Sequence, residues 1–216
     1  IAVIDDRTAF GQGLADQFVK EVKRTGHGAT IISRQFTHDK ATDFNAILTQ
    51  IRARKPDVIF YGGMDAVAGP MLKQMKALGI GARLVAGDGV CSEKLPVLAG
   101  EALGEDRVFC AVAGGVSGPQ EAVFAAFVDR YRQRYGIPLQ TYAPYAYDAV
   151  MVFAAAMQKA QSSDPAKFLP VLANIRHEGI TGSISFDPKG DLRDAALTLY
   201  TYRVGKTTKL KVLRGK

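Results

Sequence analysis

The sequence contains no tryptophan, only two cysteines and only three histidines among its 216 residues, and these shortages limit its chemistry. The histidines, His27, His38 and His177, fall in expected turns or helix ends, so a histidine base or a histidine-bound metal is not expected. A Gly-x-Ser-x-Gly nucleophile motif is also missing. We therefore predict that the chain is not an enzyme and needs no cofactor.

Long apolar runs are absent too. No stretch approaches the roughly 20 residues that a membrane helix needs, and no basic segment followed by an apolar one marks a leader, so direct membrane insertion is not expected. The chain opens inside an apolar run at residues 1–4, which predicts a segment of a longer protein and leaves its compartment open. Its 47% hydrophobic and 23% charged residues are typical of a globular protein, here one large domain or two small ones.

Basic residues outnumber acidic ones, 28 to 21, which raises the question of nucleic-acid binding. The densest basic cluster lies near the C-terminus and comprises Lys206, Lys209, Lys211, Arg214 and Lys216. It lacks the interleaved aromatic residues that stack on nucleic-acid bases. We expect a solvated surface and no nucleic-acid partner.

Short apolar runs alternate with segments of helical period through the first half of the chain. β-Branched residues are frequent in the runs at 1–4, 29–32, 57–61, 83–86 and 107–112. Between the runs, apolar residues recur every three or four positions, and helix ends are expected at Gly26, Pro56 and Gly79. This alternation predicts an α/β fold, a doubly wound parallel sheet with helices on both faces.

The pattern changes after residue 112. A glycine-rich linker at 114–119 leads into three expected helices, at about 120–135, 142–161 and 164–177, without strands between them. Their apolar stripes need a partner surface, and we expect that sheet to lie upstream of Ile1. Strand character returns at 182–186, 197–204 and 209–213, the last two forming a hairpin around Gly205 and Lys206.

The candidate ligand site follows from the predicted sheet, because ligands of doubly wound sheets bind beyond the carboxyl ends of the strands. Asp88 stands between two glycines after the fourth strand, where the backbone can approach a ligand while the carboxylate supplies one directional charge. Asp65, after the glycine pair that ends the third strand, is a second candidate. For either residue the alternative is a carboxylate that caps a helix or a turn.

Two other readings of these loops fit poorly. Gly11 and Gly13 form part of a dinucleotide fingerprint, but Asp16 stands where a third small residue belongs. The Asp5–Asp6 pair, with Asp65 after the third strand, is also typical of a phosphoacceptor receiver domain, but the lysine expected after the fifth strand is missing. An enzyme that uses a nucleotide is therefore a weak alternative.

Aromatic residues gather at the start of the second expected helix, where Tyr142, Tyr145 and Tyr147 surround Pro144. At helical spacing one or two of these tyrosines belong in a core. We expect Tyr142, ahead of the proline, to stay out of helical geometry and line a cleft.

Cys91 and Cys110 follow two consecutive strands. Neighbouring strand ends lie about 4.8 Å apart, within the range that a disulfide spans. We expect a disulfide, and hence an oxidising compartment. The alternative is two isolated buried thiols in a cytosolic protein.

Five motifs, taken together, resemble one family. They are IAVIDDRTAFGQGLADQF, VIFYGGMDAVAGPMLKQMKALGI, LVAGDGV, TYAPYAYDAV and GSISFDPKGDL. In this order and spacing they are similar to the periplasmic leucine/isoleucine/valine-binding proteins of ABC transporters. The resemblance implies the type I fold, in which two α/β lobes close over an amino acid by a hinge motion.

The resemblance also implies an organisation for the chain. Residues 1–113 match the second lobe, residues 114–193 match helical segments of the first lobe, and residues 194–216 match a β return to the second. The first part of the first lobe, including its sheet, is then missing, together with the groups that hold the ligand's α-carboxylate.

The resemblance further implies roles for single residues. Asp88 falls at the acidic position that binds the ligand's α-ammonium, Phe10 and Met64 fall at positions that contact the ligand, and Tyr142 matches an aromatic residue of the first lobe. Tyr145 is a further candidate from the same helix start, and Asp65 could add a second acidic contact. The implied function is that of a periplasmic solute-binding protein that delivers an amino acid, of the branched-chain type, to a membrane permease. The alternative is a sensor or regulatory domain of the same fold.

Overall fold

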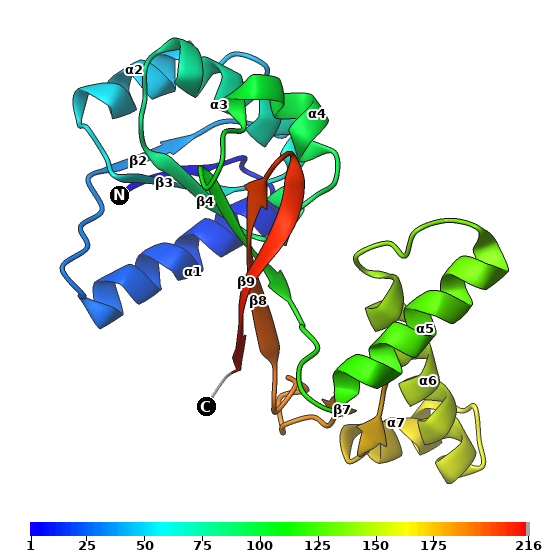
Figure 1. The fold of residues 1–216 in the computed structure, drawn as a ribbon. Helices are drawn as coiled ribbons and strands as arrows, with labels where there is room; N and C mark the ends of the chain where they lie inside the picture. The colour runs from blue at the N-terminus through cyan, green and yellow to red at the C-terminus, as the bar shows by residue number, and fades with distance from the viewer. Residues whose placement is uncertain (215–216) are drawn as a thin grey trace. The chain divides into compact units, whose positions relative to one another are not determined.

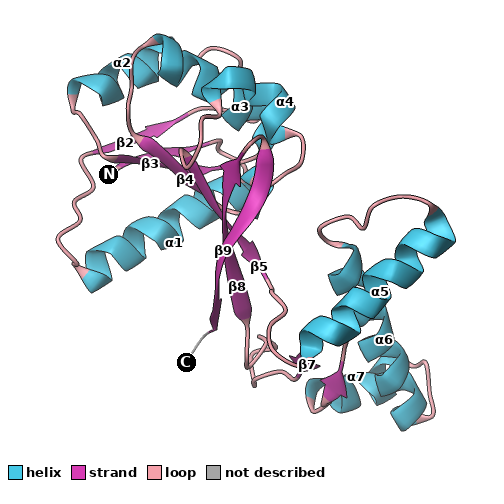
Figure 2. Cartoon of the chain, viewed as in Figure 1, coloured by secondary structure: helices cyan, strands magenta, loops and turns pink. Residues whose placement is uncertain are grey.

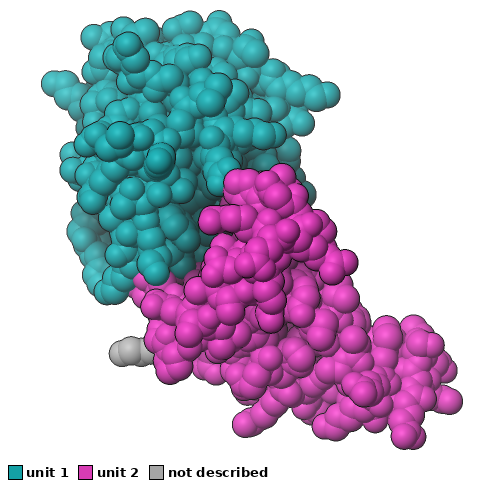
Figure 3. Space-filling model, turned by 45° about the vertical axis from the view of Figure 1, so that its right-hand side comes forward, with its two compact units in different colours: residues 1–112, 198–211 teal, residues 113–197, 212–216 magenta. Residues whose placement is uncertain are grey.

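The computed structural model describes residues 1–214, so Lys216 of the C-terminal basic cluster lies outside the described residues. The chain divides into two compact units (Figure 3). Unit 1 comprises residues 1–112 and 198–211, and unit 2 comprises residues 113–197 and the chain from 212 onward. Their assignment to two lobes of a longer protein stays a prediction.

Unit 1 is built on a sheet with the strand order β2-β1-β3-β4-β5-β8-β9. Its strands are β1 (Ala2–Asp5), β2 (Ser33–Phe36), β3 (Val58–Gly62), β4 (Arg83–Ala86), β5 (Val108–Ala113), β8 (Ala196–Arg203) and β9 (Lys206–Arg214). The first five are parallel. Two hydrogen bonds show that β8 runs antiparallel to β5. The Asp106 amide, before β5, donates to the Tyr202 carbonyl near the end of β8, whereas the Gly114 amide, after β5, donates to the Ala196 carbonyl at the start of β8.

Helices cover both faces of this sheet (Figures 1 and 2). They are α1 (Ala9–Thr25), α2 (Asn45–Ala53), α3 (Asp65–Ala77) and α4 (Leu95–Ala99), with single 3₁₀ turns η1 (Asp88–Val90) and η2 (Gly100–Ala102). Successive residues of β1 face opposite layers: Val3 packs with α1, whereas Ala2 and Ile4 pack with the core under α2, α3 and α4. The predicted α/β class, with helices on both faces of the sheet, is confirmed.

The start of α1 depends on close backbone packing. Thr8 caps the helix by accepting a hydrogen bond from the Gly11 amide at 2.9 Å. A Cβ at Gly11 would lie 2.5 Å from the Gly62 carbonyl oxygen. Glycine at this position therefore lets α1 approach the carboxyl end of β3, where the candidate ligand loops begin.

Three predicted positions are wrong. The second strand is Ser33–Phe36 and not 29–32, because the ladder pairs Ala2 with Ser33; this edge strand buries only one of its residues, so its apolar signal is weak. The predicted helix at 164–177 ends at Ala173, and His177 lies in a short strand instead of a turn. The turn of the β8–β9 hairpin consists of Val204 and Gly205, with φ of 49° and 68°, and Lys206 already belongs to β9.

Unit 2 contains α5 (Gln120–Tyr135), α6 (Ala143–Ala160), α7 (Pro165–Ala173) and the antiparallel pair β6 (His177–Glu178) and β7 (Ser183–Ile184). Its core is formed by Val152, Ala156, Phe168 and Ile175. The apolar stripes of α5 and α6 remain largely exposed in the described structure, with Val150 at 67% and Phe153 at 44%.

One buried carboxylate ties these parts of unit 2 together. Asp148 of α6 is 2% exposed, and it accepts hydrogen bonds from the Ile180 amide at 2.9 Å and from the Thr181 amide at 2.8 Å. The Thr181 hydroxyl donates a third bond at 2.5 Å. Asp148 thereby fixes the loop between β6 and β7 against the helix.

Candidate functional site

Three loops meet at the carboxyl edge of the unit 1 sheet. Phe10 belongs to the first turn of α1, Met64 is the N-cap of α3, and Gly89 lies in η1 after β4. A Cβ at Gly89 would lie 2.7 Å from the Met64 sulfur and 3.3 Å from Cε1 of the Phe10 ring. The structure therefore brings the predicted residues Phe10 and Met64 to the turn that begins with Asp88.

Asp88 is half-buried between two tightly packed glycines. A Cβ at Gly87 would meet the Leu14 side chain at 2.5 Å, and one at Gly89 would meet the Gly63 carbonyl at 2.7 Å. Phe10 and Met64, in contrast, are 44% and 49% exposed. The edge thus carries the Asp88 turn beside two accessible apolar side chains, a setting suited to a small ligand with a cationic and an apolar part.

Buried polar groups form the base of this edge. Asp6 is 2% exposed, and its Oδ1 accepts hydrogen bonds from the Thr8 amide at 3.0 Å and the Thr8 hydroxyl at 2.6 Å. Burial, and secondarily the charge of Asp6, raises the pKa of the Tyr61 hydroxyl. Tyr61 therefore stays protonated at neutral pH.

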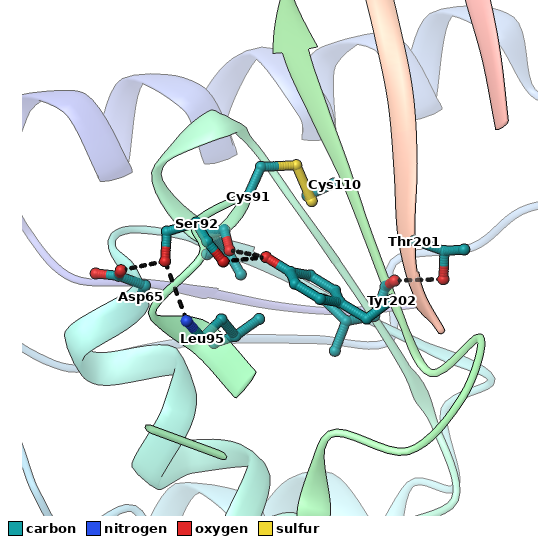
Figure 4. Close-up of a disulfide and its surroundings, with 9 residues drawn as sticks. Asp65, Cys91, Ser92, Leu95, Cys110, Thr201 and Tyr202 are labelled. Atoms are coloured by element: carbon teal, nitrogen blue, oxygen red, sulfur yellow. Dashed lines mark hydrogen bonds between the residues drawn. A yellow bond between two sulfur atoms is a disulfide. The ribbon is translucent and has the colours of Figure 1, made fainter. Parts of the chain in front are cut away.

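The segment that follows Asp88 is anchored from several elements (Figure 4). Cys91 forms a disulfide with Cys110 of β5, with the two Cα atoms 5.6 Å apart. The Tyr202 hydroxyl of β8 lies 3.0 Å from the Val90 carbonyl oxygen and 2.9 Å from that of Ser92. The expected pairing of the two cysteines is present in the structure.

Asp65 takes part in the same anchoring. Its Oδ2 accepts a short hydrogen bond from the Ser92 hydroxyl, and the Ser92 oxygen in turn accepts a bond from the Leu95 amide at 3.1 Å, where α4 begins. The geometry thus gives Asp65 a turn-stabilising partner, the alternative considered for this residue from sequence. A contact of Asp65 with a ligand stays a prediction.

Tyr142, Tyr145 and Tyr147 lie in unit 2, where the first two line a cavity of about 360 Å³. Tyr142 is the N-cap of α6 and 54% exposed, and its φ of −94° and ψ of −10° are near-helical, so the expectation that it stays out of helical geometry is wrong. Tyr145 packs so closely on Gly114 that a Cβ there would collide with its ring. Thr181, held by Asp148, lines the same cavity.

Sequence reasoning missed Tyr202 and Ser92. Tyr202 lies 110 residues beyond Ser92 in the sequence, so no local spacing links them. The signal that was present is the alternation in β8, in which Thr198, Tyr200 and Tyr202 share one face of the strand. That alternation predicts a strand, but it does not identify which loop the buried hydroxyl contacts.

Within residues 1–214, no three acidic, histidine or cysteine side chains are grouped closely enough to hold a metal ion. The described helices also include none with the length and apolar character needed to cross a membrane.

Comparison with known proteins agrees with this geometry. Residues 1–209 match a family model described as periplasmic binding protein. Leu/Ile/Val-binding protein homolog 1 of Brucella abortus is 30% identical over 99% of this chain and 56% of its own length. An amino acid binding protein of Pseudomonas aeruginosa is 31% identical over 94% of this chain and 53% of its own length. The chain thus spans about half the length of the curated relatives it matches.

Solved structures show the same similarity. The leucine-binding protein LivK of Thermotoga maritima superposes with a TM-score of 0.84 at 25% identity, over 98% of this chain and 59% of that one. LivJ of Streptococcus pneumoniae, a branched-chain amino acid transporter substrate-binding protein in complex with isoleucine, gives a TM-score of 0.78 at 26% identity, over 99% of this chain and 59% of that one.

Proposed function

Because the chain belongs to the periplasmic binding protein family, a family of solute-binding proteins and not of enzymes, we propose that it binds an amino acid for an ABC importer. The ligand in this proposal is a branched-chain amino acid, the permease of the importer is the partner, and the protein acts outside the cytoplasm. Relatives named for Leu, Ile and Val, and a similar structure in complex with isoleucine, support this choice of ligand. The disulfide between Cys91 and Cys110 supports an oxidising compartment.

The observation that carries the proposal is the meeting of the Asp88–Val90 turn with Phe10 and Met64 at one edge of the sheet, where Gly89 packs beside both side chains. The α-ammonium group of an amino acid donates hydrogen bonds to the Asp88 carboxylate. Its aliphatic side chain contacts the Phe10 ring and the flexible thioether of Met64, which adapts to branched shapes. Tyr142 and Tyr145 belong to unit 2, and their contact with the ligand stays a prediction from the resemblance.

Calorimetric titration of the intact protein with leucine, isoleucine and valine tests the proposal, after a thermal-shift screen of the twenty amino acids. A charge-assisted hydrogen bond contributes about 1.5–3 kcal/mol, so Asp88→Ala is expected to weaken binding at least tenfold. Asp57→Ala is the matched control. Asp57 directly precedes β3 and therefore lies at the amino ends of the parallel strands, away from the carboxyl ends where Asp88 lies. Equal affinity of the Asp88→Ala variant and the parent protein would refute the assigned role of Asp88.

Uptake of labelled amino acid by cells that lack the gene tests the transport part. We expect uptake to fall when the gene is deleted. Unchanged uptake, with binding intact in the purified protein, would favour the sensor alternative.

A further inference from the structure

The segment from Val90 to Ser92 is held at each of its three residues. The Val90 and Ser92 carbonyls both accept from the Tyr202 hydroxyl, at 3.0 Å and 2.9 Å. Cys91, between them, is bonded to Cys110 of β5. Ser92 also donates to Asp65 at the start of α3. Strands β5 and β8 and helix α3 therefore converge on three consecutive residues.

Tyr202 contributes to this anchoring through its hydroxyl group alone. Its side chain is fully buried in the main core of unit 1, and its bond to the Val90 carbonyl is buried, whereas its bond to the Ser92 carbonyl is partly buried. The hydroxyl has one hydrogen and two carbonyl acceptors, and it shares that hydrogen between them. The two acceptors flank the disulfide-bonded Cys91, so the hydroxyl fixes the backbone on both sides of that residue.

The anchored residues are linked directly to Asp88. The Cys91 amide donates to the Asp88 carbonyl at 3.0 Å, and the Val90 amide donates to the Gly87 carbonyl at 3.3 Å. Asp88 itself stands between two glycines, whose backbones have more freedom than those of other residues. Packing holds the two glycines from the side, and the bonds to Val90 and Cys91 link the backbone that carries the Asp88 carboxylate to the anchored residues at the far end of the turn.

We propose that Tyr202 is a positioning residue that holds the turn Asp88–Val90 so that the Asp88 carboxylate is preoriented for the ligand's ammonium group. The inference rests on the proposed role of Asp88. Tyr202 acts through the Val90 and Ser92 carbonyls and makes no contact with the ligand in this proposal. Preorientation raises affinity because the turn is ordered before the ligand arrives.

Tyr202→Phe removes the hydroxyl and keeps the ring in the core. We expect this variant to bind the amino acid about threefold to tenfold more weakly, the range for loss of one neutral hydrogen bond. Tyr200→Phe is the matched control: Tyr200 is half-buried against the same core and lies two residues earlier on the same face of β8. The control is expected to bind like the parent protein, and thermal unfolding establishes that both variants are folded at the titration temperature.

A double-mutant cycle with Asp88→Asn separates positioning from a general structural effect. If Tyr202 acts through Asp88, Tyr202→Phe weakens binding in the parent protein and has little further effect in the Asp88→Asn background. An equal loss in both backgrounds, or no loss in the parent, overturns the inference. If Asp88→Asn alone leaves binding unchanged, the proposed function of Asp88 fails instead.

Hydrogen exchange provides a second readout that needs no ligand. The amides of residues 89–92 are expected to exchange several-fold faster in Tyr202→Phe than in the parent protein or in Tyr200→Phe. Unchanged exchange in this segment would show that the hydroxyl does not hold the turn, whatever the ligand is.

Discussion

At the scale of single residues, three buried polar side chains bond backbone groups of loops and helix starts. Asp148 accepts from the loop between β6 and β7, Asp6 accepts from the residue that caps α1, and Tyr202 bonds the segment after Asp88. Tyr202 and Asp148 bond segments that lie 110 and 33 residues away in the sequence, whereas Asp6 bonds Thr8, two residues later. The loops of Asp88 and Asp65 follow from the sequence because strand ends share one edge of a sheet, whereas the contacts of Tyr202 do not, because its partners are main-chain carbonyls that carry no sequence signal.

Two buried tyrosines predict loss of stability at alkaline pH. Burial raises the pKa values of Tyr61 and Tyr202 above their ordinary value near 10. The unfolded chain then loses these protons at lower pH than the folded chain, so the stabilisation is complete below pH 10 and is lost as pH rises further. We expect the free energy of unfolding to fall above pH 10 by about 1.4 kcal/mol per pH unit for each tyrosine.

Urea unfolding between pH 8 and 11.5 measures this effect. Tyr202→Phe is expected to fall less steeply with pH than the parent protein, whereas Tyr135→Phe, a change at a 57% exposed tyrosine, is expected to keep the parent slope. Identical slopes for the Tyr202→Phe variant and the parent would contradict the argument.

At the scale of elements, strands buried on both faces were easier to predict than strands at the edge. The fourth predicted run coincides with β4, Arg83–Ala86, which lies inside the sheet. The second was placed at 29–32, four residues early, because apolar Ile31 and Ile32 precede the edge strand while the strand itself contains Arg34 and Gln35. The hydrophobic pattern of the sequence locates a strand whose two faces are both covered. The position of a strand at the edge of the sheet is set instead by its pairing register with the neighbouring strand.

Because α1 lies close to β3, alanine substitutions at two glycines of this helix are expected to change the free energy of unfolding in opposite directions. A Cβ at Gly11 would lie 2.5 Å from the Gly62 carbonyl oxygen, whereas a Cβ at Gly13 meets nothing within 4 Å. Gly11→Ala is therefore expected to destabilise the fold by about 1–3 kcal/mol through overpacking. Gly13→Ala is expected to stabilise it by about 0.5–1 kcal/mol, because alanine loses less backbone entropy in a helix.

Chemical denaturation of the two variants and the parent protein measures both effects. Equal stabilities of the Gly11→Ala and Gly13→Ala variants would show that α1 can move away from β3 at little cost.

At the scale of the whole molecule, the chain leaves unit 1 after residue 112 and returns to it at residue 198. The return strand β8 completes the sheet beside β5 and supplies Tyr202. The sequence predicted this return from the resemblance, and the strand pattern gave its approximate place. The exposed stripes of α5 and α6 were also visible in the sequence, because their period is helical over several turns.

The disulfide is expected to stabilise unit 1 as a whole. Cys91 and Cys110 close a loop with a separation of 19 residues, and closing a loop of this size in the unfolded chain contributes about 3 kcal/mol in the chain-entropy model. The double variant Cys91→Ala/Cys110→Ala should lose about 2–4 kcal/mol of unfolding free energy. Urea titration with and without reductant measures this effect. Added reductant should lower the free energy of unfolding of the parent protein and leave that of the double variant unchanged. An unchanged free energy of unfolding in the fully reduced parent protein would contradict the prediction.

The late return of β8 has a consequence for biosynthesis. Tyr202 is made 110 residues after Ser92, and at about 5–20 residues per second a ribosome needs roughly 5–20 seconds to cover that distance. From the completion of β5 until β8 is made, β5 has an open edge toward the position that β8 will fill, and an open strand edge pairs readily with other chains. The growing chain therefore passes through a period in which a strand edge is unpaired, and slowing translation between residues 112 and 198 should increase aggregation of the nascent protein.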